Sequence, residues 1–198
     1  MKIHTIGDSH SNFGNINLPE IIHHWIFGIL CYSFGIGKLN RVNIKNYHDI
    51  RDDDVVIFCF GEIDCRCHIK KFITKENDYT KIIDNLINNY VDAVKVNINQ
   101  YSNLTTCLYN VIPPTREYCL QSQDIYPIIG TDEERKSYHL YFNKKLKEAC
   151  AINNFIFFDI YDKYTDEYGF LKEEYKDNSV HINDGIFICE FMKNFRYY

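Results

Sequence analysis

The sequence predicts an α/β fold with a mostly parallel central sheet, and three observations support this. Apolar stretches of strand length alternate with stretches whose apolar residues recur at helical spacing. The run Val55–Phe60 is apolar throughout, as in a parallel strand buried on both faces. Connections are short, and no repeat, linker or change of composition divides residues 1–198, so we expect a single domain.

The strands are expected where short apolar runs end at glycine, proline or polar residues. We expect them at residues 2–6, 20–27, 55–60, 107–112 and 155–159. The residues that close the first four are Gly7, Gly28, Gly61 and Pro113. In open parallel sheets ligands bind at the carboxyl ends of the strands, so the chemistry is expected near these residues.

Three helices are expected between or after the strands. Residues 79–100 carry apolar residues at helical spacing, from Ile82 to Val94. Thr131 followed by three acidic residues is typical of a helix start, and this helix should run to about Ala151. A closing helix is expected from Asp184 to Phe195.

Composition excludes several classes of partner. The net charge is -5 and the basic residues are scattered, which argues against nucleic acid. No apolar run reaches the roughly 20 residues that span a bilayer. The chain passes directly into its first expected strand without a signal peptide, so we expect no membrane association and a cytoplasmic protein. Nothing in the sequence indicates the oligomeric state.

The eight cysteines are expected to be free thiols, because several lie in apolar runs and a chain of this length needs no disulfides. Cys65, Cys67 and His68 form a short cluster that could ligate a metal. Without a second ligand pair elsewhere it is weak support for zinc, and we expect no metal.

Gly7-Asp8-Ser9 directly follows the first expected strand. A serine at a glycine turn between strand and helix presents its hydroxyl at the sheet edge, and its backbone N–H can help to stabilise an oxyanion. The tripeptide alone is better explained as an ordinary turn, because turns are rich in such residues. His10 is a rival base, but adjacent side chains in such a turn usually diverge, so it is better interpreted as a cavity residue.

Two further segments carry chemically useful residues. Asp177 and His181 lie on one expected loop, and could supply the base and the orienting carboxylate that a serine nucleophile needs. The alternative for this segment is a solvated loop that caps the closing helix. Glu62, Asp64 and Arg66 follow the buried strand, where they form either part of a site or a local ion-pair network.

Taken in order, these segments resemble the SGNH/GDSL hydrolase family. Gly7-Asp8-Ser9 matches its first block, and Gly61-Glu62-Ile63-Asp64 matches its third, Gly-X-Asn-Asp. Asp177 and His181 match its fifth block, Asp-X-X-His, loosely, and Gly28 is the candidate for the second-block glycine. The resemblance spans nearly the whole chain.

The resemblance implies a three-layer α/β/α sandwich of the flavodoxin-like type, acting on acyl esters without a cofactor. It implies that Ser9 is the nucleophile, His181 the general base and Asp177 the residue that orients the base. The backbone N–H groups of Ser9 and Gly28 would form part of the oxyanion hole. The remaining candidates for oxyanion or substrate contacts are Gly61, Asp64 and Arg66.

The sequence departs from the family pattern at two places. Ile63 replaces the asparagine that donates to the oxyanion, and losing such a donor typically costs about 10²–10³ in rate. Arg66 is the nearest cation that could replace it or bind an anionic or polyhydroxyl substrate. Asp177 lies four residues before His181 instead of three, so either Asp177 or Asn178 could orient the imidazole.

Three functions are compatible with these residues. The first is a serine esterase that removes small acyl groups, such as acetyl, from a carbohydrate or related polar molecule. The second is an acyltransferase that uses the same serine to acylate a sugar hydroxyl. The third is a non-catalytic glycan-binding module, which the missing asparagine and the irregular fifth block would favour. The pair His23-His24 is assigned no role.

Overall fold

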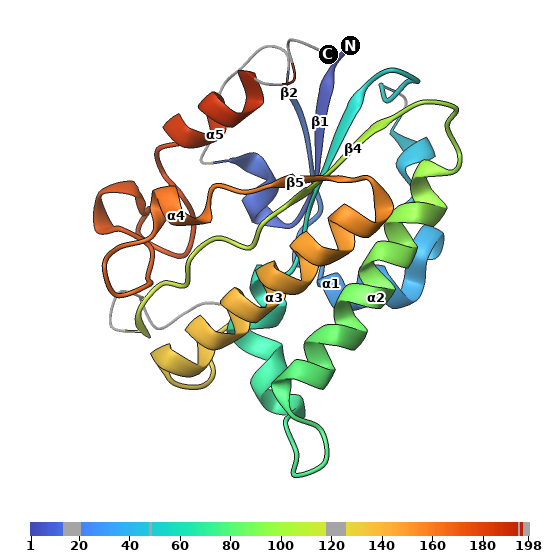
Figure 1. Cartoon of the computed structure of the whole chain (residues 1–198). Coiled ribbons are helices and arrows are strands. Elements are labelled where there is room, and N and C mark those ends of the chain that lie inside the picture. The colour runs from blue at the N-terminus through green and yellow to red at the C-terminus, as the bar shows by residue number, and fades with distance from the viewer. Residues whose placement is uncertain (14–20, 48, 118–125, 194, 196–198) are drawn as a thin grey trace.

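The computed structural model describes residues 1–13, 21–47, 49–117, 126–193 and 195. A five-stranded sheet in the order β2-β1-β3-β4-β5 forms its centre (Figure 1). The strands are β1 (Ile3–Gly7), β2 (Ile21–Trp25), β3 (Val55–Cys59), β4 (Thr105–Tyr109) and β5 (Ile156–Phe158). Every neighbouring pair is parallel. The α/β fold is therefore confirmed, with the flavodoxin-like strand order.

Helices cover both faces of the sheet, which makes three layers (Figure 1). One face carries α1 (Cys31–Gly37), α2 (Tyr79–Ile98) and α3 (Asp132–Asn153). The other carries the 3₁₀ turn η1 (Ser9–Asn12) and the helices α4 (Tyr161–Tyr164) and α5 (Ile186–Met192). Because successive strand residues point to opposite faces, Val56 and Phe58 enter the first core, and Val55 and Ile57 the second.

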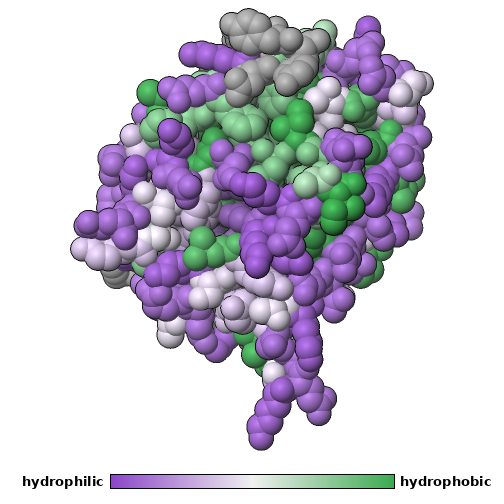
Figure 2. All heavy atoms as spheres, viewed as in Figure 1, coloured by the Kyte–Doolittle hydropathy of each residue, from purple (hydrophilic) through white to green (hydrophobic). Residues whose placement is uncertain are grey.

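The two long helices begin where their sequences provide caps. Asp78 accepts hydrogen bonds from the first backbone N–H groups of α2. At α3, Thr131 and Glu134 form the reciprocal capping box that the sequence predicts. Hydrophilic side chains cover much of the outward face of both helices in Figure 2, as expected for helices that bury one apolar side against a sheet.

The element boundaries differ from the sequence prediction in several places. The second strand is shorter than residues 20–27, and α5 is shorter than residues 184–195. The helix α1 was not predicted, because its sequence, CYSFGIG, contains two glycines and no helical cap of its own. Tertiary contacts hold it instead: Phe34 is fully buried, and α1 packs closely on α2.

Short helical turns fill the connections. They are η2 (Lys38–Asn40), η3 (Ile44–Asn46), the π-helical turn η4 (Asp64–His68), η5 (Ile69–Phe72) and η7 (Glu173–Tyr175). The turn η4 follows β3 directly, at the carboxyl edge of the sheet. Single π turns of this kind are frequent at functional sites.

Three expectations about the whole chain meet the structure as follows. No helix among the described residues is long and apolar enough to cross a membrane. The seven cysteines in the described ranges are free, and Cys119 lies outside those ranges. Within the same ranges, no group of three or more His, Cys, Asp or Glu side chains is arranged to hold a metal.

Candidate active site

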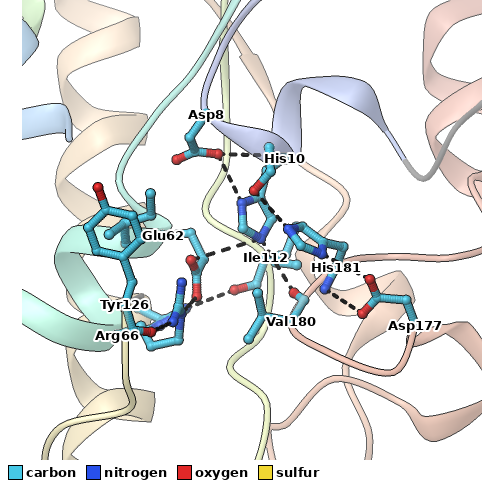
Figure 3. A network of polar contacts seen from close by, with 12 residues as sticks. Asp8, His10, Glu62, Arg66, Ile112, Tyr126, Asp177, Val180 and His181 are labelled. Carbon is cyan, nitrogen blue, oxygen red and sulfur yellow. Dashed lines mark hydrogen bonds and ion pairs between the residues drawn. The ribbon is translucent and has the colours of Figure 1, made fainter. Parts of the chain in front are cut away.

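Ser9, His181 and Asp177 lie in hydrogen-bonding contact at the carboxyl edge of the sheet. The Nε2 atom of His181 is 2.7 Å from Oγ of Ser9, and its Nδ1 atom is 2.9 Å from Oδ2 of Asp177. Figure 3 shows the imidazole of His181 with the carboxylate of Asp177 on its outer side. The imidazole is thus placed to accept a proton from the serine while the carboxylate holds the other ring nitrogen.

Gly7 brings Ser9 to this edge. A Cβ atom on residue 7 would lie 1.9 Å from the backbone oxygen of Cys59, so only glycine lets β1 run this close to β3. Beyond it, the Asp8 side chain accepts from the backbone N–H of His10 and starts the turn η1. The chain therefore turns immediately after the strand and presents the hydroxyl of Ser9.

The loop from Asp177 to His181 absorbs the extra residue of the fifth segment. The backbone N–H of Asp177 donates to the carbonyl of His181, and Oδ1 of Asp177 accepts from the N–H groups of Ser179 and His181. Burial alone would raise the pKa of Asp177, but hydrogen bonds from His181 and Ser179 lower it below its ordinary value. The carboxylate of Asp177, not the amide of Asn178, contacts the imidazole.

A cavity of about 330 Å³ opens beside Ser9. Gly28, Ile63 and Arg66 line it together with Ser9 and His181. Ile63 thus lines the cavity beside Ser9 at the position where the family motif has asparagine, and its side chain offers no hydrogen-bond donor.

Gly28 lines the cavity in a backbone conformation that suits glycine. Its φ is +60°, and a Cβ atom would lie 2.4 Å from the hydroxyl oxygen of Tyr126. That hydroxyl donates to the carbonyl of Gly28 across 3.0 Å. Within the described residues, no hydrogen bond is made by the N–H groups of Ser9 and Gly28.

Gly61 and Asp64 lie outside this cavity, in contrast to their expected contacts with the oxyanion or substrate. A Cβ atom on residue 61 would lie 2.5 Å from the ring of Phe142, so the glycine permits the close packing of α3. Asp64 accepts from the N–H groups of Cys31 and Tyr32 at 2.7 and 3.1 Å. It caps α1 from another part of the chain, because α1 has no local side-chain cap.

A second cavity confirms the separate position of Asp64. It has a volume of about 460 Å³, lies between η4 and α2, and includes Asp64, His68 and Leu86 in its walls. None of its lining residues belongs to the Ser9 cavity. The larger cavity is therefore separate from the candidate active site at Ser9.

Arg66 lines the Ser9 cavity but takes part in a buried ion pair. Its Nε donates to Oε1 of Glu62 at 2.6 Å, and Nη1 donates to the carbonyl of Tyr126. Burial alone would raise the pKa of Glu62, but Arg66 and His10 lower it to about 2. The ion-pair network that the sequence allowed here is present, and it supports Tyr126, which in turn holds Gly28.

His10 points away from Ser9 and packs behind His181. Its Nδ1 is 2.9 Å from Oδ1 of Asp8, and its ring centroid is 4.7 Å from that of His181. Figure 3 shows Asp8, His10 and Glu62 grouped on one side of the His181 ring. As the turn geometry predicts, the side chains of residues 9 and 10 diverge, and His10 does not contact the hydroxyl as a rival base.

Five other lining residues were not singled out from the sequence: Trp25, Phe27, Tyr126, Ser179 and Val180. Trp25 and Phe27 are 52% and 68% exposed, and they end the strand-like run before Gly28. Their place at the carboxyl end of a strand was a usable signal. Nothing local in the sequence marks Tyr126, because its contacts to Gly28 and Arg66 are tertiary.

No known protein-family model matches the sequence, and no curated protein matches it. Solved structures do match. A proposed acylhydrolase from Bacteroides fragilis is 17% identical, with a TM-score of 0.60, 99% of this chain covered and 84% of that chain. A GDSL-like lipase from Bacteroides thetaiotaomicron is 15% identical, with a TM-score of 0.59 and coverages of 99% and 85%.

Phospholipase A1 from Streptomyces albidoflavus is more distant in sequence, at 11% identity, yet the match covers 98% of both chains with a TM-score of 0.59. At these identities the likeness is one of fold. The chain has the α/β architecture that the GDSL hydrolases share, over almost its entire length.

Proposed function

We propose that this chain, which has the fold of the SGNH/GDSL hydrolases, is a serine esterase that removes small acyl groups from a carbohydrate or another polar alcohol. The observation that carries the proposal is the 2.7 Å contact between Nε2 of His181 and Oγ of Ser9. The fold shared with a GDSL-like lipase and with phospholipase A1 supports the same reaction class.

In the proposed reaction, Oγ of Ser9 attacks the ester carbonyl carbon as its proton passes to Nε2 of His181. Asp177 stabilises the resulting imidazolium. When the tetrahedral intermediate collapses, His181 returns the proton to the departing alcohol oxygen and the acyl group remains on Ser9. A water molecule then loses a proton to His181 and attacks the acyl carbon. The bond between that carbon and Oγ of Ser9 breaks, His181 returns the proton to Oγ, and the carboxylic acid is released.

The oxyanion would be stabilised mainly by backbone. The N–H groups of Ser9 and Gly28 are the proposed donors, and Ile63 adds none. Arg66 is less suited to this role than the sequence suggests, because Glu62 and the carbonyl of Tyr126 already engage its guanidinium. A hole with two backbone donors predicts slower chemistry than one with an added side-chain donor.

The cavity supports a small acyl group on a polar ring. Its roughly 330 Å³ is at the lower end of ligand sites, and it must hold both the acyl and the alcohol portions. The exposed rings of Trp25 and Phe27 form an apolar rim on which a sugar face can pack. We therefore propose acetyl esters of a glycan or small carbohydrate as substrates.

Acyl transfer to a sugar hydroxyl would use the same three residues and differ only in the acceptor. The non-catalytic alternative, a glycan-binding module, has weaker support. Such a module does not need an imidazole held between a serine and a carboxylate, and the contacts of Ser9, His181 and Asp177 favour catalysis.

The test uses purified protein with p-nitrophenyl acetate, butyrate and octanoate. We expect hydrolysis of the acetate, a kcat/KM that falls with chain length, and loss of activity in Ser9→Ala. A fluorophosphonate probe should label wild-type protein at Ser9. If the protein shows neither turnover nor labelling, the esterase proposal fails and the glycan-binding module becomes the better explanation. If an acylated sugar forms from an acyl donor, the protein is a transferase.

A further inference from the structure

We propose that His10 is a positioning residue held permanently as an imidazolium behind His181, where its charge lets His181 act as a base at lower pH. The inference deepens the proposed function and rests on it, because His181 is the proposed base. It concerns a residue that does not line the 330 Å³ cavity, although with Ser9 and His181 it lines a hollow of only about 10 Å³.

Carboxylates lie near both ring nitrogens of His10. Nδ1 is 2.9 Å from Oδ1 of Asp8, and Nε2 is 4.0 Å from Oε2 of Glu62. All three side chains are at least 90% buried. A neutral imidazole has only one N–H, whereas an imidazolium can direct a proton toward each carboxylate.

Two carboxylate oxygens without hydrogen bonds also support a charged His10. Oδ2 of Asp8 and Oε2 of Glu62 are buried and make no hydrogen bond within the described residues. Two buried carboxylates need compensating positive charge. Arg66 pairs with Glu62, and an imidazolium at His10 compensates Asp8. With His10 charged, the cluster of Asp8, His10, Glu62 and Arg66 is neutral.

The electrostatic balance agrees with this geometry. Burial alone would lower the pKa of His10, but Asp8, followed by Glu62, raises it above its ordinary value. Arg66 acts in the opposite direction, with a smaller effect than Asp8 or Glu62. From α3, His139 faces Glu62, and burial lowers the pKa of His139 to about 4, so it remains neutral.

This charge acts on His181 through direct ring contact. The two ring centroids are 4.7 Å apart, and Nε2 of His10 lies 3.4 Å from the carbonyl of Val180, the residue before His181. The groups that face His181 are His10, Ser9 and Asp177. Asp177 favours the protonated ring, and a positive charge at His10 opposes it.

Removing the charge at His10 should therefore move the acid limb of the kcat/KM profile to higher pH. The expected displacement of that limb is about one pH unit, because the two rings are close but His181 lines an open cavity. His10→Asn is the sharper variant, since its amide retains a donor near the position of Nδ1 and removes the charge. His10→Gln is the second variant. His24→Gln, on β2, is the control, because His24 contacts His4 and Tyr47 and neither Ser9 nor His181.

The experiment combines ¹⁵N NMR of the histidine rings with the pH profile of kcat/KM. In the wild type, both His10 nitrogens should remain protonated above the ordinary pKa of a histidine ring. In His10→Asn, the acid limb of kcat/KM should move up by about one pH unit, while His24→Gln leaves it unchanged.

A singly protonated His10 ring at pH 7 would overturn the proposal. So would an unchanged acid limb of kcat/KM in a folded His10 variant. The wild-type spectrum decides the charge state even when neither variant folds. If the rings behave as stated and no ester is hydrolysed, the proposed function fails and the charge arrangement stands, so the two failures are distinguishable.

Discussion

The hydroxyl of Tyr126 donates a hydrogen bond to the backbone carbonyl of Gly28, with 3.0 Å between the two oxygens. This contact fixes the peptide next to a proposed oxyanion donor. It also occupies the space that a side chain on residue 28 would need, since a Cβ atom there would lie 2.4 Å from the same hydroxyl.

Gly28→Ala should therefore lower both stability and activity. The left-handed φ of +60° and the contact with Tyr126 together should reduce the free energy of unfolding by about 1–3 kcal/mol. We expect kcat to fall more than KM rises, because the displaced N–H serves the transition state. Urea unfolding and steady-state kinetics measure the two effects.

The double variant Gly28→Ala with Tyr126→Phe separates strain from crowding. Removing the hydroxyl relieves the closest contact, so the double variant should be more stable than the sum of the two single effects predicts. Strictly additive losses would show that the hydroxyl does not crowd residue 28.

Ile63→Asn should increase activity. Ile63 lines the cavity beside Ser9, and an amide there could add a side-chain donor to the oxyanion hole. Since one such donor is typically worth about 10²–10³ in kcat, we expect a gain of at least about tenfold with imperfect geometry. Kinetics on p-nitrophenyl acetate provide the measurement, with Ile63→Val as the size control. If the Ile63→Asn variant folds but has a lower kcat than the wild type, an amide at residue 63 does not add a donor to the oxyanion hole.

Asp177→Asn should lower kcat by about 10²–10⁴, because an amide can favour the wrong tautomer of His181 and does not stabilise its charged form. The neighbouring Asn178→Ala should retain wild-type kcat, since the carboxylate of Asp177 makes the contact with the ring. Equal losses in both variants would mean that the loop, and not the carboxylate, orients the base.

Stability should decline as the pH falls from about 6.5 toward 4. Burial, together with His4, lowers the pKa of His24 to about 4, and burial lowers that of His139 to about 4. These rings bind protons more readily in the unfolded chain, so acid favours unfolding across this window. Thermal melts between pH 7 and pH 4 should show it, and His139→Gln should flatten the slope.

The sheet was predictable because its signals are local. Val55–Phe60 is continuously apolar, and Thr131 with Glu134 specifies the start of α3, so both appear where the sequence places them. The helix α1 could not be predicted in this way, because Asp64, which caps it, lies 33 residues along the chain from Cys31. A cap supplied across the fold leaves no pattern in the segment that it stabilises.

The candidate site divides in the same way. The sequence identifies Ser9, Asp177 and His181, because each stands in a short motif, and the structure brings the three into contact. Gly61 and Asp64, which the sequence also offers as site residues, pack against Phe142 and cap α1 and do not line the cavity beside Ser9. The sequence also leaves out Tyr126, whose contribution depends on contacts with residues 98 and 60 positions away.

The contact between Ser9 and His181 joins residues 172 positions apart along the chain. During synthesis Ser9 leaves the ribosome long before His181 has been added to the chain. Until the loop from Asp177 to His181 has been made and has docked, the nascent protein carries an ordinary, unreactive hydroxyl. If Ser9 is the nucleophile that we propose, reactivity arises only after the last strand, β5, has formed and this loop has docked. A chain that ends before the loop should then leave esters unhydrolysed.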